Sequence, residues 1–255
     1  MVQKKAGRSA VGRAMAILYW FSPERQEATV AQLSSDLGIP PATTYRIVRD
    51  LKDWGMIDYD PLTKKNRLGP MVLNFAKVYS QSTTLVKIAH PYMQELRDQT
   101  GETVSLNVVI DNERICIDEV RSIHGLHWSV PPGTRGPLYA GSTGKAILAY
   151  MEPAQLCRIQ ETLELKPLTP ITPTDWETIH ADLDKVRRQG YSVTVGEAGP
   201  GVGGCAAPIL DEDDHSAGAI NLSAPLIRWT DENVERYKVL VRETAMKISR
   251  AYTQR

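Results

Sequence analysis

Residues 29–54, TVAQLSSDLGIPPATTYRIVRDLKDW, determine the fold of the N-terminal part of the chain. Apolar residues recur at helical spacing on both sides of Gly38, which predicts two short amphipathic helices joined by a tight turn. Thr29 is expected to cap the first helix, and Pro41 suits the first turn of the second. The residues expected to be buried are Val30, Leu33 and Leu37 in the first helix and Ile47, Val48, Leu51 and Trp54 in the second. This arrangement is typical of a helix-turn-helix and predicts DNA binding.

Small and polar side chains gather on the outer face of the second predicted helix, towards its N-terminal half. A recognition helix meets base edges in the major groove with such positions. The residues expected to read bases are Ala42, Thr43, Thr44, Tyr45, Arg46 and Arg49. For this segment alone, an ordinary helical hairpin with a solvated polar face is the alternative interpretation.

A β-hairpin wing is predicted directly after these helices. Residues 56–60 read as a strand, residues 61–66 as a turn-rich basic tip, and residues 67–68 as the returning strand. A wing beside a recognition helix can reach the flanking phosphates, which position the domain without reading sequence. The residues added to the DNA-binding set are Lys64, Lys65 and Arg67 of the wing and Arg13 of the preceding helix.

Charge divides the chain in the same way. The 255 residues carry 30 basic and 30 acidic side chains, but residues 1–70 hold 11 basic against 7 acidic, and the remainder is correspondingly acidic. A basic N-terminal part joined to an acidic C-terminal part favours a DNA-binding module connected to a second domain.

The basic N-terminal ten residues are expected to be disordered and lack the apolar core of a signal peptide. Three separated cysteines and no apolar run of membrane length predict a cytoplasmic protein without a membrane partner.

Strands are predicted in the C-terminal part from Thr103 onwards, where apolar and polar residues alternate. Residues 103–110 and 113–120 read as a hairpin, and further strands are expected at 127–130, 191–197, 205–210 and 217–224. Helices are expected from about residue 70, from Thr84, from 141 with Ser142 or Thr143 as cap, from a capping box at 174–177 to Arg188, and from Thr230. The first two could pack within one chain or form a dimer seam. The antiparallel strands with surrounding helices predict an α+β domain on one curved sheet.

Five stretches together resemble the IclR family of bacterial transcription regulators. They are VGRAMAIL at residues 11–18, CIDEV at 116–120, GTRGPLYAGSTGKAIL at 133–148, GPGVGGCAAPILD at 199–211 and INLSAPL at 220–226. The resemblance covers essentially the whole chain. It implies a winged helix-turn-helix at residues 1–70, a linker helix at 71–87 and a GAF-like effector-binding domain at 88–255. It further implies dimers through the DNA-binding half and tetramers through the effector half.

The start of the predicted helix at Gly141 can hold an anion, because free backbone N–H groups and two hydroxyls meet there. A plain capped helix is the alternative. The resemblance implies that Ser142 and Thr143 hold an effector, a carboxylate or an aromatic acid in chemical class, through main-chain amides. It also places Gly125, Trp128 and Gly136 in an apolar wall, although Trp128 could be a core anchor instead.

The opposite side of the implied pocket consists of Glu197, Gly204, Cys205, Asn221 and Ser223. Gly204 stands where the family usually has a cysteine, so Cys205 is expected to face the other side of its strand. Asn221 and Ser223 are two residues apart and can both point inward, or else face solvent.

Enzyme and metal interpretations have little support in the sequence. His124 and His127 are the only close histidine pair, without ligand-spaced partners, and Ser142 lacks a nucleophile-elbow motif. We therefore predict a transcription regulator, repressor or activator, that is not an enzyme and needs no cofactor or metal. Its expected partners are a palindromic double-stranded operator, a small-molecule effector of a catabolic operon and copies of itself as homodimer or homotetramer. The alternatives are a ligand-binding sensor without transcriptional output and a serine hydrolase using Ser142.

Overall fold

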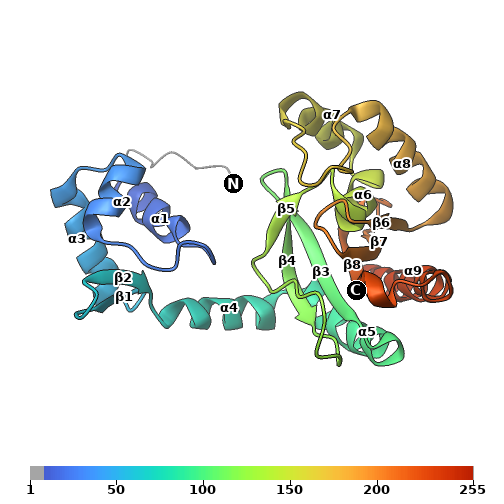
Figure 1. Ribbon diagram of the computed structural model, residues 1–255, viewed down its shortest axis with the longest axis horizontal. Coiled ribbons are helices and arrows are strands. Elements are labelled where there is room, and N and C mark those ends of the chain that lie inside the picture. The colour runs from blue at the N-terminus through green and yellow to red at the C-terminus, as the bar shows by residue number, and fades with distance from the viewer. Residues whose placement is uncertain (1–8, 255) are drawn as a thin grey trace. The chain divides into compact units, whose positions relative to one another are not determined.

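The computed structural model describes residues 9–254, and its backbone contacts divide the chain into two compact units, residues 1–79 and 80–255 (Figure 1). The basic N-terminal stretch expected to be disordered lies almost entirely outside the described residues. No helix among residues 9–254 has the length and apolar character needed to cross a membrane.

The first unit is a winged helix-turn-helix, as predicted. Its elements are α1 (Ala10–Trp20), α2 (Val30–Leu37), α3 (Pro41–Asp53), β1 (Ile57–Asp60) and β2 (Lys65–Leu68). Thr29 and Gln32 form a capping box at the start of α2, and Gly38 ends it in the left-handed conformation, at φ 63°. The wing is tied to the segment before α2, because Asn66 exchanges two backbone hydrogen bonds with Ala28, of 2.7 and 2.9 Å.

Two predictions about α3 are wrong. Trp54 was expected in the core but is 76% exposed, because α3 ends at Asp53 and the chain turns away. Thr44 was expected to read bases but is fully buried. Its hydroxyl bonds the carbonyls of Ile39 and Pro40 at 3.3 and 3.2 Å, so it holds the turn between the two helices.

The second unit is built on one antiparallel sheet, in agreement with the predicted α+β class. Its strand order is β5-β4-β3-β8-β7-β6. The strands are β3 (Thr103–Ile110), β4 (Glu113–Val120), β5 (Arg135–Pro137), β6 (Ser192–Val195), β7 (Val202–Leu210) and β8 (Ser216–Pro225). The helices are α5 (Thr84–Thr100), α6 (Gly141–Ala149), α7 (Pro153–Thr162), α8 (Trp176–Gln189) and α9 (Asp231–Thr253), with a short 3-10 helix, η1 (Leu226–Arg228). Helix α4 (Met71–Ser82) spans the boundary between the two units.

Helices cover both faces of this sheet (Figure 1). Buried residues of α5 and α9 pack on one face, against Val104, Leu106, Ile220 and Leu222. On the other face, α6 and α8 pack with Ala206 and Ala219. We call this second face the α6 face. The sheet therefore separates two hydrophobic cores, and the polar residues considered below lie between the sheet and α6.

Several predicted boundaries in this unit need correction. Residues 127–130 form no strand; the strand next to β4 is β5, and it begins at Arg135. Helix α7 was not predicted. The expected capping box before α8 is a single cap, in which Asp175 accepts a 2.7 Å hydrogen bond from the backbone of Thr178. Helix α6 has no side-chain cap, because its cap position is Ala140; Ser142 and Thr143 lie inside the helix and are buried, at 4% and 6% exposure.

Candidate DNA-binding surface and effector site

The outer face of α3 presents polar side chains to solvent. Ala42, Tyr45, Arg46 and Arg49 are exposed, and Thr43 is partly exposed. The Arg49 side chain reaches Asp50 only at 3.5 Å and stays 61% exposed. These five residues remain available for base contacts, because the apolar side of the helix is buried through Ile47 and Val48.

The basic residues of the wing are partly neutralised by neighbouring carboxylates. Arg67 donates to Asp58 at 2.8 Å, and this hydrogen bond, with that from the Tyr59 backbone, lowers the pKa of Asp58. Lys65 lies 3.4 Å from Glu27. Lys64 sits at the hairpin tip with a left-handed backbone, at φ 57°. The wing therefore offers fewer unpaired charges than its sequence suggests, and phosphate binding there has to compete with these exposed pairs.

The amides at the start of α6 are not an open anion cradle. Gly141 enters the helix at φ 81°, and its N–H donates to Glu197 Oε2 at 3.1 Å. The N–H of Ser142 donates to Thr194 Oγ1 at 2.9 Å. An effector carboxylate could use these two amides only by displacing Glu197 and Thr194.

Ser142, Asn221 and Ser223 form a buried hydrogen-bonded chain on the α6 face. The Ser142 hydroxyl donates to Asn221 Oδ1 at 2.8 Å, and Asn221 Nδ2 donates to Ser223 Oγ at 2.7 Å. Gly204 is required beneath this chain, since a Cβ there would lie 2.5 Å from Ser142 Oγ. The glycine at this position lets α6 approach the sheet.

Cys205 lies on the opposite face, as expected from the alternation of side chains along β7. It packs in the core beneath α9, and burial raises the pKa of its thiol to about 12. Its inclusion among the effector residues is therefore not supported by its position.

Lys145 is the most deeply buried charged side chain near the start of α6, at 2% exposure. Its Nζ lies 2.7 Å from Asp182 Oδ2 and 2.7 Å from Glu197 Oε1. Burial alone would raise the pKa of Asp182, but the hydrogen bond and charge of Lys145, with those of Lys185, lower it. Glu197 thus holds both the first amide of α6 and its lysine, which fixes the helix start against β6.

The three residues predicted for the apolar wall have different environments. Trp128 is 37% exposed and lies against Gly199, where a Cβ would meet its ring at 2.9 Å. Gly125 is exposed in the same connection between β4 and β5. Gly136 lies under a charged group instead of an apolar one: a Cβ there would be 2.7 Å from Nη2 of Arg114.

Sequence reasoning missed four residues of the α6 face, namely Ser105, Asn107, Arg114 and Thr194. Ser105 pairs across the strands with Asn221, and Asn107 pairs with Cys116. Alternating polar residues at 103, 105 and 107 in a strand that should be buried were the available signal. Nothing in the sequence distinguished Arg114 from a solvent-exposed arginine.

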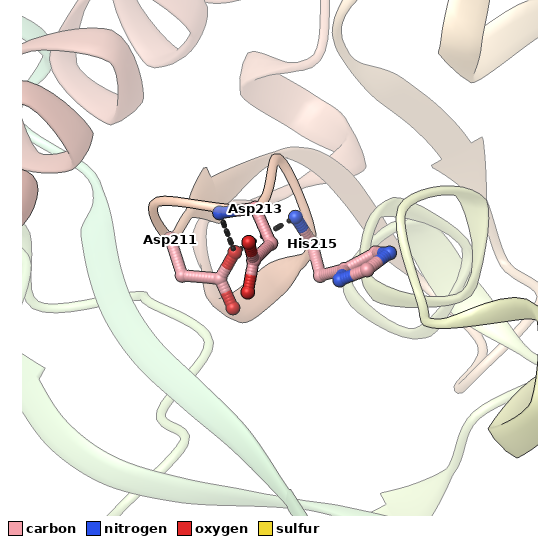
Figure 2. A group of neighbouring side chains, drawn as sticks. All are labelled: Asp211, Asp213 and His215. Carbon is pink, nitrogen blue, oxygen red and sulfur yellow. Dashed lines mark hydrogen bonds between the residues drawn. The ribbon is translucent and has the colours of Figure 1, made fainter.

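A second polar cluster lies at the turn between β7 and β8. Asp211, Asp213 and His215 are the group of potential metal ligands found among the described residues. Figure 2 shows its local cause: Asp211 Oδ1 accepts from the backbone N–H groups of Asp213 and His215, at 3.0 and 2.9 Å. The cluster borders an open cleft of about 590 Å³, which Glu152 also lines. Its carboxylates make that cleft unsuitable for an anionic effector, and it lies apart from the Ser142 chain.

Comparison with known proteins identifies the family. The model described as "IclR helix-turn-helix domain" matches residues 10–61, and that described as "Bacterial transcriptional regulator IclR C-terminal" matches residues 77–250. The chain belongs to the IclR family. It is a DNA-binding transcriptional regulator with an effector-binding domain, as the winged helix and the curved sheet predicted.

Relatives within the IclR family match over nearly their whole length. The HTH-type transcriptional repressor AllR of Escherichia coli K12 is 30% identical over 96% of this chain and 90% of its own. The regulator BhcR of Paracoccus denitrificans is 28% identical over 97% and 88%. An IclR regulator from Alicyclobacillus acidocaldarius aligns with a TM-score of 0.86 at 25% identity, covering 94% and 97%. An IclR homologue from Microbacterium hydrocarbonoxydans, crystallised with 4-hydroxybenzoate, gives 0.80 at 25% identity, covering 95% and 100%.

The buried Lys145 predicts a specific acid sensitivity. Because the folded-state pKa of Asp182 is depressed, its contribution to stability is present above its ordinary value of 3.8 and is lost as the pH falls through the folded value. Lys145→Met should lower the free energy of unfolding at pH 7 by on the order of 2–3 kcal/mol, less than for a fully buried pair because both carboxylates keep some solvent contact. It should also flatten the pH dependence of the free energy of unfolding below about pH 4.

Denaturant unfolding between pH 3 and 7 measures both effects. Lys185→Met, which removes the exposed partner of Asp182, is the control and should have a much smaller effect.

The close approach of Gly204 to Ser142 predicts energetic coupling between the two positions. Gly204→Ala should destabilise the protein by about 1–3 kcal/mol, because the methyl group displaces the Ser142 hydroxyl. Adding Ser142→Ala should recover part of this loss, and a double-mutant cycle in denaturant unfolding measures the difference. Gly125→Ala, where a methyl group meets open space, is the control. Strictly additive effects would contradict the contact.

Proposed function

We propose that this regulator binds a palindromic operator as a homodimer or homotetramer in the cytoplasm, and that a small organic or aromatic acid alters its occupancy of a catabolic operon. The observation that carries the proposal is the exposed polar face of α3 beside a wing, in a chain of the IclR family. The relative crystallised with 4-hydroxybenzoate supports an acid as effector. A gel shift with the DNA upstream of its own gene, with and without candidate acids, tests it.

We propose the same three functional segments that the sequence predicts. Residues 1–70 bind DNA, residues 88–255 bind the effector, and residues 71–87 connect the two. The base-reading set becomes Ala42, Thr43, Tyr45, Arg46 and Arg49, without the buried Thr44. The phosphate-binding set stays Arg13, Lys64, Lys65 and Arg67. The proposed effector site centres on Ser142, Thr143, Asn221 and Ser223, where α6 approaches the sheet.

Self-association is supported by apolar side chains that one chain leaves in solvent. On α4, Leu73, Phe75 and Val78 are 72%, 59% and 56% exposed, and no residue of this helix is buried. On α1, Val11 and Tyr19 are 73% and 56% exposed. Exposed apolar surface of this kind favours a protein interface. We propose that these helices form the dimer seam, in preference to packing within one chain.

The alternative functions have less support. The Ser142 hydroxyl donates to the amide oxygen of Asn221, which cannot act as a general base, so we propose no hydrolase activity. We likewise propose no metal or cofactor requirement, since the Asp211 cluster is accounted for by its turn. A sensor without transcriptional output would leave the exposed face of α3 unused, and absence of DNA binding at low salt would favour it.

Arg46→Ala should weaken operator binding by about 1–3 kcal/mol and relax the preference at one base position, if the guanidinium binds a base edge in bidentate fashion. Lys65→Ala should weaken all DNA sequences similarly and reduce the salt dependence. Thr44→Val is the control inside the helix: it should lower stability but leave base preference unchanged, because this side chain faces the turn. Binding titrations on operator and scrambled DNA at several salt concentrations measure these effects. Unchanged base preference in Arg46→Ala would remove that residue from the reading set.

Paired half-sites are expected in the operator. One recognition helix with a modest basic excess gives weak binding, so two copies should contact half-sites one or more helical turns apart. Inserting about half a helical turn between the half-sites should abolish tight binding, whereas a full turn should restore part of it. Sedimentation of the protein on both DNAs measures the stoichiometry. A stable monomer on a single half-site would contradict the proposal.

A further inference from the structure

Arg114 is a charged side chain on the α6 face of the sheet. It lies on β4, opposite Val109 of β3 and Gly136 of β5. The guanidinium lies directly over Gly136, where any side chain would collide with it. The absence of a side chain at Gly136 thus leaves room for Arg114.

The guanidinium has no anionic partner among residues 9–254. Its Nε is buried without a hydrogen-bond partner, and no described carboxylate lies within ion-pair distance. The neighbouring Arg135 pairs with Glu113 at 2.9 Å, and Arg228 grips Glu102 with two hydrogen bonds. Burial lowers the pKa of Arg114. The residue as a whole is partly exposed, but its buried Nε lacks a partner, and a buried donor without a partner is costly, so a ligand is the natural partner.

Asn107 supplies an unused acceptor on the same face. It lies on β3, diagonal to Arg114, and is fully buried. Its Nδ2 donates to Ser105 Oγ at 3.1 Å, but its Oδ1 is the other buried side-chain atom without a hydrogen-bond partner in the described chain. One face of the sheet therefore holds a positively charged donor and an acceptor without hydrogen-bond partners. They lie next to the Ser142 chain, whose side chains hydrogen-bond to one another.

We infer that Arg114 and Asn107 form the polar anchor of the effector site and select an acid that also carries a hydroxyl or N–H group. The carboxylate accepts from the Arg114 guanidinium, and the hydroxyl or N–H donates to Asn107 Oδ1. This inference rests on the proposed effector role of the α6 face. It places the acid group on the sheet instead of at the start of α6, whose first two amides already have acceptors.

The first test needs no ligand. Replacing a partly buried, unpaired charge by an apolar side chain of similar length should stabilise the protein, so Arg114→Met should raise the thermal midpoint of the full-length protein. Arg135→Met, which breaks an existing pair on the next strand, should lower the midpoint or leave it unchanged. A lowered midpoint in Arg114→Met would show that this arginine is structural and would overturn the inference.

The second test measures thermal shifts with defined acids. The panel is acetate, lactate, benzoate and 4-hydroxybenzoate, each beside its neutral amide. Wild type and Arg135→Met should be stabilised by at least one acid and not by its amide, and Arg114→Met should bind that acid at least about tenfold more weakly. In wild type, lactate should stabilise more than acetate, or 4-hydroxybenzoate more than benzoate. In Asn107→Leu this difference should disappear.

Two outcomes of the second test would overturn the inference. One is an acid response that Arg114→Met retains. The other is the absence of any response to these acids in wild type, since a partly exposed guanidinium without a counter-charge should bind at least one of them at high concentration by mass action. Gel shifts with wild type test the proposed DNA-binding role separately. If wild type binds the operator but Arg114→Met binds the acids as tightly as wild type does, the proposed anchor is wrong and the proposed DNA-binding role stands.

Discussion

The pairing of β3 with β8 is the constraint on which the effector-binding unit depends. Ser105 stands opposite Asn221, and Val104 opposite Leu222. Because side chains alternate along a strand, this register sends the apolar set to α5 and α9 and the polar set to α6. A slip by one residue would exchange the two faces, burying amides in the apolar core and exposing leucines to the proposed site. The register thus determines at once where the core lies and where a polar ligand can bind.

Close packing around α6 is the second constraint, and it depends on two glycines: Gly144 faces the segment after β5, and Gly204 faces α6 from the sheet. A Cβ on Gly144 would lie 2.1 Å from the carbonyl oxygen of Leu138, and one on Gly204 would collide with Ser142. The helix start is then held by Glu197, which binds both the first amide of α6 and the buried Lys145. The polar groups at this end are therefore mostly committed to structure. Among residues 9–254, the buried side-chain atoms without a hydrogen-bond partner belong to Asn107 and Arg114 on the sheet, which is why the position of Arg114 matters more than the helix dipole.

The sequence predicted elements with strong periodicity and failed where tertiary contacts override local pattern. The hairpin at residues 103–110 and 113–120 was predicted to the residue, because alternation and an Asp-Asn turn agree. Helical periodicity predicted that Trp54 is buried and Thr44 exposed, but the reverse holds. The end of α3 leaves Trp54 in solvent, and the turn before α3 buries Thr44. The hydroxyl of Ser142 suggested a cap, but its partner is 79 residues away on β8. The sequence could not identify Arg114 as a candidate site residue, because its lack of a hydrogen-bond or ion-pair partner depends on how the sheet packs.

An effector bound at the α6 face can affect DNA binding only if the two conformations it distinguishes also differ at the winged helix. Within one chain, the covalent connection is α4 followed by α5. Strand β4 carries Arg114 towards α6, while Ile117 and Val120 of the same strand pack against α5 residues such as Met93. A ligand that neutralises Arg114 therefore acts on a strand whose reverse side supports α5. Because close-packed cores transmit small displacements, β4 and α5 are the elements through which occupancy would be coupled to the DNA-binding unit. The coupling must be reciprocal: operator DNA should change the affinity for the acid by the same factor by which the acid changes the affinity for DNA.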